Sequence, residues 1–215
     1  MKLYPINLDI DGKACMVIGG GQVALRKIRG LLAAGAKVKV IAPEICAEVE
    51  ELARCGEISL TREKFSMDML NDEIILIAAT DNTEVNQRAS QAKNILVNVV
   101  EGMGGNFNVP STIRRGELLL TISTGAKSPA FSKFIRQMLE AELDENFGAG
   151  LKIISRWRRE LKHLLPNHKQ RQIFWQQVLT QETWQLLKHG QLNELEERIN
   201  HALKSFGLES PHGTD

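Results

Sequence analysis

The fold is decided by residues 14–27, which read Ala14-Cys-Met-Val-Ile-Gly-Gly-Gly-Gln-Val-Ala-Leu-Arg-Lys27. The apolar run that ends at Ile18 is typical of a buried strand; glycines then break it, and apolar residues at helical spacing follow. The pattern Gly19-x-Gly21-x-x-Ala24 is the dinucleotide-binding fingerprint in its alanine-ended form. Gly19 permits the tight turn, Gly21 lets a pyrophosphate approach the backbone, and Ala24 lets the helix lie close to the sheet. Between a strand and a helix, this pattern predicts a nucleotide site rather than a turn that serves packing alone.

Composition narrows the class of protein. The chain has 215 residues, enough for one ordinary domain and an appendage, and its formal net charge of +1 gives no sign of a nucleic-acid partner. No apolar run approaches the roughly 20 residues of a membrane span, and the first residues lack the apolar segment of a signal peptide. Cys15, Cys46 and Cys55 lack metal-ligand spacing and read as reduced thiols, so we expect a cytoplasmic protein that binds neither nucleic acid nor membrane.

Strand and helix patterns alternate along the first hundred residues. Strands are expected at 4–8, 14–18, 37–42, 58–62, 74–79 and 95–100, with helices between most of them. This repetition predicts an α/β fold with a parallel, doubly wound sheet. A hairpin is expected next, over 109–113 and 118–123. Ser128-Pro129 then marks a helix start, and the chain from about residue 147 reads as helical throughout.

With these elements placed, the sequence resembles the N-terminal family of siroheme synthases, whose members are precorrin-2 dehydrogenases and, in part, also sirohydrochlorin ferrochelatases. The stretches that carry the resemblance follow the family's order along the first 140 residues. They are Val17-Ile-Gly-Gly-Gly-Gln-Val-Ala-Leu-Arg-Lys27, Ala78-Ala-Thr-Asp-Asn82 with Asn86, Asn98-Val-Val100, Val109-Pro-Ser111 and Ser123-Thr-Gly-Ala-Lys-Ser-Pro129. No methyltransferase domain is present in the sequence, so the resemblance implies the stand-alone form rather than the fused enzyme.

The resemblance implies a division into three parts and a homodimer that builds the substrate cleft. We expect an NAD-binding Rossmann domain at 1–113, a small α+β dimerisation segment at 114–147 and a helical C-terminal domain at 148–215. The apolar residues Phe131, Phe134, Ile135 and Met138, at helical spacing, also favour a dimer contact in the region of residues 113–147.

The resemblance also implies the chemistry. Family members use NAD+ to remove a hydride from precorrin-2, a carboxylated tetrapyrrole, and bifunctional members then insert Fe2+ as a substrate. NAD contacts fall on the glycine turn and just after the second strand of the dinucleotide fold, which assigns the cofactor to Gly19, Gly21, Gln22, Val23, Pro43 and Glu44. No basic residue stands between Ile41 and Ile45, which favours NAD over NADP. For Glu44, an exposed surface charge is nearly as good an interpretation as a contact with the cofactor.

The family's catalytic carboxylate is an aspartate that follows Asn-Val-Val, and this chain has Glu101 there. Its carboxylate, on a glycine-rich loop, would take a proton as the hydride leaves, unless it is simply a solvated loop residue. Lys127, Ser128 and Arg114 are the candidate ligands of the substrate's carboxylates. A plain helix cap is the favoured interpretation of Ser128 by itself, and a solvated surface position is the favoured interpretation of each cation by itself. No resident metal site is expected, because the five histidines lie in the helical tail or beyond it without ligand spacing.

Two alternatives stay open at this stage. In the first alternative, the chain is mainly a chelatase with a vestigial nucleotide site. In the second, it is an NAD-sensing regulatory domain. Regulatory domains of the second kind usually keep an acid at the end of the second strand, where this chain has Ala42-Pro43. The loop residues Glu101, Lys127 and Ser128 would also have no purpose in a sensor.

Overall fold

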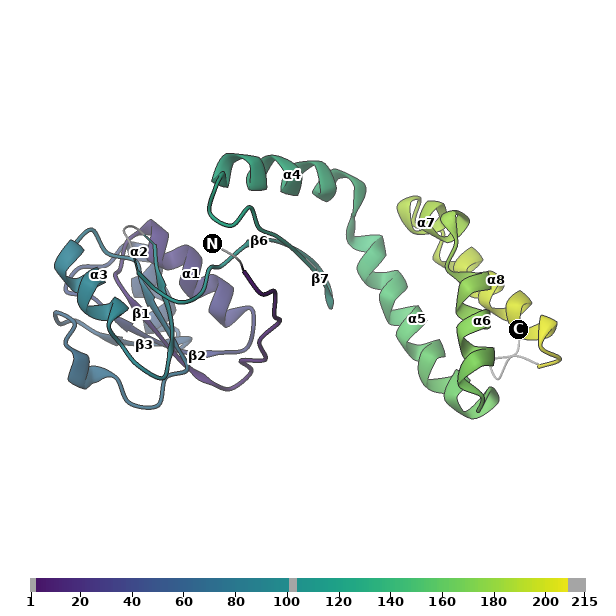
Figure 1. Cartoon of the computed structure of the whole chain (residues 1–215), viewed down its shortest axis with the longest axis horizontal. Helices are drawn as coiled ribbons and strands as arrows, with labels where there is room; N and C mark the ends of the chain where they lie inside the picture. The colour runs from purple at the N-terminus through teal and green to yellow at the C-terminus, as the bar shows by residue number, and fades with distance from the viewer. Residues whose placement is uncertain (1–2, 101–103, 209–215) are drawn as a thin grey trace. The chain divides into compact units, whose positions relative to one another are not determined.

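The computed structural model describes residues 3–100 and 104–208, and it divides the chain into two compact units, Met1–Val109 and Pro110–Asp215. Each unit has its own helices and strands (Figure 1). Buried apolar residues form two clusters in the first unit and one in the second. The predicted α/β class with a helical C-terminal region is confirmed.

The first unit is a doubly wound parallel sheet in the order β3-β2-β1-β4-β5. Its strands are β1 (Ala14–Ile18), β2 (Lys37–Ile41), β3 (Ile58–Thr61), β4 (Ile75–Ala78) and β5 (Leu96–Val99). Its helices are α1 (Gln22–Leu32), α2 (Ala47–Arg54), the short 3-10 helix η1 (Met67–Met69) and α3 (Thr83–Ser90). The strand order reverses between β1 and β4, which is where ligands bind in sheets of this type.

The two faces of this sheet are buried by alternate residues of each strand. In β1, Cys15 and Val17 join the core beneath α1 and α2, while Met16 and Ile18 join the core that includes Ala89 of α3. A strand covered on both faces has to be apolar throughout, which is why β1 reads as a continuous hydrophobic run.

The prediction of a strand at residues 4–8 is wrong. Residues 3–10 form no strand, and the Tyr4 side chain is 88% exposed. Pro5 has no N–H to donate to a ladder, and the alternating pattern around it has no strand beside it to pair with. The other strands begin and end within two residues of their expected bounds, and helices lie between most of them as expected.

The second unit begins with an antiparallel hairpin of β6 (Ser111–Arg115) and β7 (Leu118–Ile122). Five helices follow: α4 (Pro129–Glu142), α5 (Glu145–Leu164), α6 (His168–Val178), α7 (Gln181–Lys188) and α8 (Leu192–Ser205). Trp157, Phe174 and Leu195 are fully buried at the centre of the helical core. Gly148 lets α5 pass the hairpin, since a Cβ there would lie 2.6 Å from the carbonyl oxygen of Arg115. In the part of the chain that the structure describes, no helix is both long and apolar enough to cross a membrane.

Candidate functional site: the glycine turn and the loops beside it

The three glycines after β1 have different surroundings. Gly19 has a φ of +117°, and a Cβ there would lie 2.2 Å from the carbonyl oxygen of Ala79. A Cβ on Gly20 would lie 2.3 Å from the carbonyl oxygen of Glu44. A Cβ on Gly21 would meet no atom within 4 Å. The first two glycines therefore let neighbouring loops approach, and the third faces open space.

The start of α1 is left open to an anion. Gly21 is its N-cap, no side chain caps the helix, and its first turn has no acidic residue. By contrast, the side chains of Asn82 and Ser128 cap α3 and α4. The unpaired N–H groups at the start of α1 and the helix dipole both favour a phosphate group. Since Gly21 adds no side chain in front of them, these residues fit the pyrophosphate of a dinucleotide.

Backbone hydrogen bonds hold the neighbouring loops against the glycine turn. The Gly19 amide donates to the Ile41 carbonyl over 2.9 Å, and the Cys46 amide donates to the Gly20 carbonyl over 2.8 Å. The Ala79 amide donates to the Ile18 carbonyl over 2.8 Å. These bonds bring together the loops that follow β1, β2 and β4, and Pro43 and Glu44 are exposed on the second of them. The residues assigned to the cofactor thus share one edge of the sheet.

Gln22, also assigned to the cofactor, has a partner that the sequence did not suggest. Its Nε2 donates to Glu48 Oε1 over 3.1 Å, joining the start of α1 to the first turn of α2. Hydrogen bonds from the backbone amide of Glu48 and from Gln22 lower the pKa of this carboxyl. Glu48 therefore places a fixed negative charge beside the turn. The sequence did hold one sign of this contact, because Glu48 lies in the first turn of the helix that follows the second strand of the sheet.

The loop after β4 is fixed by its own side chains. Asn86 Nδ2 donates to the Thr80 carbonyl over 2.8 Å, and the Asn82 amide donates to Thr80 Oγ1 over 2.9 Å. Asn82 Oδ1 accepts from the Val85 amide and caps α3. The Ala78–Asn82 stretch quoted for the resemblance is thus a rigid turn at the cofactor edge.

The end of β5 leads to the predicted catalytic residue. Asn98 is buried, its Nδ2 donates to the Phe107 carbonyl over 3.0 Å, and its backbone pairs with Gly105. Within the described residues, Asn98 Oδ1 has no hydrogen-bond partner. Glu101 itself lies outside the described residues.

The three residues assigned to the substrate all lie in the second unit. Ser128 Oγ accepts from the Phe131 amide over 3.2 Å and caps α4, as predicted, and Lys127 is exposed on the turn just before it. Arg114 is exposed on β6 opposite Leu119, near the turn of the hairpin. Lys127 and Ser128 instead follow β7 and belong to the other end of the hairpin. The structure therefore groups Lys127 with Ser128 and leaves Arg114 apart from them.

Comparison with known proteins agrees with this geometry. A family model described as "Putative NAD(P)-binding" matches residues 6–111, and the "Sirohaem synthase dimerisation region" matches residues 147–203. The siroheme synthase of Photorhabdus laumondii is 34% identical over 213 residues, which are 97% of this chain and 45% of that protein. The siroheme synthase of Nitrosospira multiformis is 38% identical over 187 residues, which are 83% of this chain and 40% of that protein. The chain is thus similar to one part of the siroheme synthases.

A solved structure extends the likeness. The chain matches "SirC, precorrin-2 dehydrogenase" with a TM-score of 0.75 and 27% sequence identity, over 91% of this chain and 100% of the other. The chain spans less than half the length of the two siroheme synthases above. The dimerisation region named by the family model begins at the last residue of the predicted 114–147 segment.

Proposed function

We propose that this chain oxidises precorrin-2 to sirohydrochlorin, with NAD+ bound at the glycine turn. The observation that carries the proposal is the likeness to a precorrin-2 dehydrogenase over that enzyme's whole length. The open, uncapped start of α1 supports it, because it provides the anion site that a dinucleotide needs.

NAD+ supplies the hydride acceptor when it is bound. The backbone at Gly19, Gly21, Gln22 and Val23 binds its pyrophosphate, while Pro43 and Glu44 lie at the ribose side. A 2′-phosphate would face the negative charges of Glu44 and Glu48 and would find no cation between Ile41 and Ile45, so NAD is preferred to NADP. Calorimetric titration with both nucleotides tests this preference, and equal affinities would refute it.

Glu101 is proposed as the group that takes the proton released with the hydride. Its position directly after Asn98-Val-Val100 supports this role, because the family that the sequence resembles has its catalytic aspartate there. Lys127, Ser128 and Arg114 are proposed to bind the carboxylates of the tetrapyrrole. The two cations supply charge, and the Ser128 hydroxyl has a proton to donate even while its oxygen accepts from Phe131.

Single-turnover formation of NADH from precorrin-2 tests the activity and the base together. Glu101→Gln keeps the size of the side chain and removes the base, so we expect a rate lower by about 10²–10⁴-fold. NAD+ binding should survive, and Glu101→Asp should keep substantial activity. A Gln variant as fast as the parent would show that another group or water takes the proton.

The same assay, repeated with Fe2+, separates the alternatives. A chain that is mainly a chelatase would consume sirohydrochlorin and Fe2+ without forming NADH from precorrin-2. An NAD-sensing domain would do neither. NADH formation without metal supports the dehydrogenase, and consumption of sirohydrochlorin on adding Fe2+ would establish the second activity.

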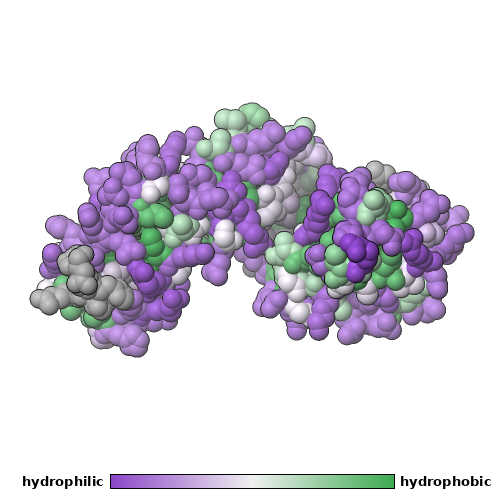
Figure 2. Space-filling model, turned by 180° about the vertical axis from the view of Figure 1, so that it is seen from behind, coloured by the Kyte–Doolittle hydropathy of each residue, from purple (hydrophilic) through white to green (hydrophobic). Residues whose placement is uncertain are grey.

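We further propose that the protein is a cytoplasmic homodimer. The face of α4 is apolar although exposed in the single chain: Phe131, Phe134 and Met138 are 55%, 53% and 55% exposed. Figure 2 shows an apolar patch along the outer side of α4, at the top of the view. Sedimentation showing a monomer at micromolar concentration would overturn the dimer. The three free thiols support a reducing compartment.

A further inference from the structure

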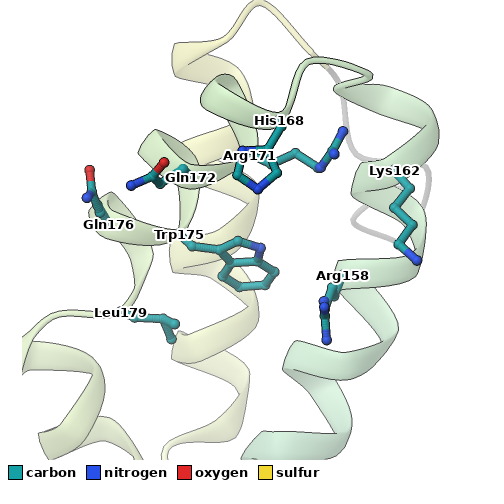
Figure 3. Close-up of a pocket in the computed structure, with 8 residues that line it drawn as sticks. All are labelled: Arg158, Lys162, His168, Arg171, Gln172, Trp175, Gln176 and Leu179. Carbon is teal, nitrogen blue, oxygen red and sulfur yellow. The ribbon is translucent and has the colours of Figure 1, made fainter.

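The helical part of the second unit contains a cavity of about 520 Å³ between α5 and α6. Figure 3 shows Arg158 and Lys162 on α5, and His168, Arg171 and Trp175 on α6, around this space. Its volume lies within the range of about 300–1,000 Å³ that is usual for small-molecule sites.

The charges of the cavity are unbalanced. Arg158, Lys162 and Arg171 line it, and none of the described residues that line it is a carboxylate. Among the described residues, neither Arg158 nor Lys162 forms an ion pair. Like charges that share a cavity repel one another, so this arrangement favours a bound anion.

Arg171 is held in place by the protein. Its Nη1 donates to the Leu165 and Pro166 carbonyls over 2.6 and 2.7 Å, which are the free carbonyls at the end of α5. These bonds fix the guanidinium plane and leave its other N–H groups for a ligand. A cation fixed in this way binds an anion at a lower entropic cost than a freely moving lysine does.

Trp175 gives the cavity an aromatic wall. Its indole and the Phe174 ring form a T-shaped pair, with ring centres 5.3 Å apart and planes at 85°, and Trp175 is only half buried. Figure 3 shows the ring projecting from α6 into the space lined by Arg158. An indole that lines a cavity and is only partly buried can stack against a planar ring.

We propose that this cavity binds a planar anion of nucleotide size, which is a conjugated ring that carries phosphate or carboxylate groups. The ring stacks on Trp175, and the acidic groups pair with Arg158, Lys162 and Arg171. The inference uses only residues of α5 and α6 and stands independently of the proposed dehydrogenase activity. Two sources share this chemistry: a nucleotide, or a carboxylated pyrrole or porphyrin.

Calorimetric titration of the full chain with four probes tests the proposal. ATP and uroporphyrin combine a ring with acidic groups, adenosine has only the ring, and pyrophosphate has only the charge. Titrations are carried out in a Gly21→Asp background, which weakens binding at the glycine turn. Binding that reversal of the cavity charges does not weaken is counted as binding at another site and against the proposal. ATP or uroporphyrin should bind at least about tenfold more tightly than adenosine and pyrophosphate, since both contacts are needed. Preference for ATP identifies a nucleotide, and preference for uroporphyrin identifies the carboxylated ring.

Matched charge reversals locate the site. Arg158→Glu with Lys162→Glu should weaken binding by about 100-fold, because each charge-assisted contact is worth about tenfold or more. Lys152→Glu with Arg159→Glu makes the same charge change at exposed positions of α5 outside the cavity and should have little effect. Trp175→Ala should weaken binding, and Trp175→Phe should restore most of it.

Three results would overturn the proposal. The first is that neither ATP nor uroporphyrin binds. The second is equal loss of affinity in the two charge-reversal pairs, which would indicate general attraction to a basic surface. The third is a change of sedimentation on reversal of Arg158 and Lys162, which would show that the cavity belongs to a contact between copies.

Discussion

Gly21→Asp is expected to strengthen the fold and to weaken the cofactor site at the same time. Gly21 is the N-cap of α1, its φ is −85°, and a Cβ there meets no atom within 4 Å. Asp is a favoured N-cap residue, and its side chain accepts hydrogen bonds from the first N–H groups of a helix. Those are the groups that the structure leaves open for a phosphate.

The magnitudes of the two effects can be worked out separately. Replacing Gly by Asp at an N-cap gains a few tenths of a kcal/mol, and a negative charge at a helix start adds about 0.3–1 kcal/mol. The melting temperature should therefore rise by roughly 1–4 °C. A carboxylate about 4 Å from a phosphate charge costs ~1 kcal/mol in water and ~4 kcal/mol at an effective dielectric constant of 20. The NAD+ dissociation constant should rise roughly fivefold to a thousandfold.

Calorimetric titration with NAD+ and thermal melting without nucleotide measure these effects on the same variant. Gly21→Asn is the matched control, since Asn has the same size and also caps helices but carries no charge. The difference in affinity between the Asp and Asn variants should shrink as salt is added, because added ions screen the repulsion. A folded Asp variant with unchanged NAD+ affinity would refute the assignment of the pyrophosphate to this turn.

Three other predictions follow from particular contacts. Gly19→Ala should lower the unfolding free energy by about 2 kcal/mol or more, because its φ of +117° and the Ala79 carbonyl oxygen at 2.2 Å both exclude a Cβ; urea denaturation measures this, and an unchanged midpoint would contradict it. Ser128→Ala should cost about 1 kcal/mol through loss of the α4 cap, and Ser128→Asn should recover most of it in the same assay. Burial and, to a lesser degree, the Glu73 carboxylate raise the pKa of Cys15 from 9.0 to about 11. The unfolded state then loses this proton first, so stability should fall by roughly 2 kcal/mol as pH rises from about 9 to about 11, and Cys15→Ala should remove that part of the decline.

Most of the first unit was predictable because its strands are covered on both faces. A buried parallel strand has to be apolar at every position, and glycine or a polar cap has to end it. Runs such as Ile75–Ala78 can therefore be recognised in the sequence. The expected strand at Tyr4–Leu8 failed because a partner strand decides whether an alternating segment pairs. Pairing is a property of the sheet and cannot be read from the segment itself.

The candidate site was predictable where function follows from backbone geometry. The fingerprint placed Gly19 and Gly21 correctly at the turn, but it could not show that a Cβ on Gly20 would lie 2.3 Å from the Glu44 carbonyl oxygen. Contacts between side chains of different elements were not accessible either. The bond from Gln22 to Glu48 joins residues 26 positions apart, and the cavity beside Trp175 brings together separate turns of α5 and α6. The spacing within one helix does not indicate which residues of another helix will face it.

Comparison of α1 and α4 shows how one kind of helix start serves two different tasks. The first N–H groups of α1 have no side chain in front of them, so an anion can use them directly. In α4 the Ser128 oxygen already accepts from the Phe131 amide, so the helix start is partly satisfied by the protein. A substrate carboxylate near Ser128 would then depend on the Ser128 hydroxyl proton and on the neighbouring charge of Lys127. Removing the Lys127 charge should therefore raise KM for precorrin-2 without altering NAD+ affinity. Adding a negative charge at Gly21 should weaken NAD+ binding without altering KM for precorrin-2.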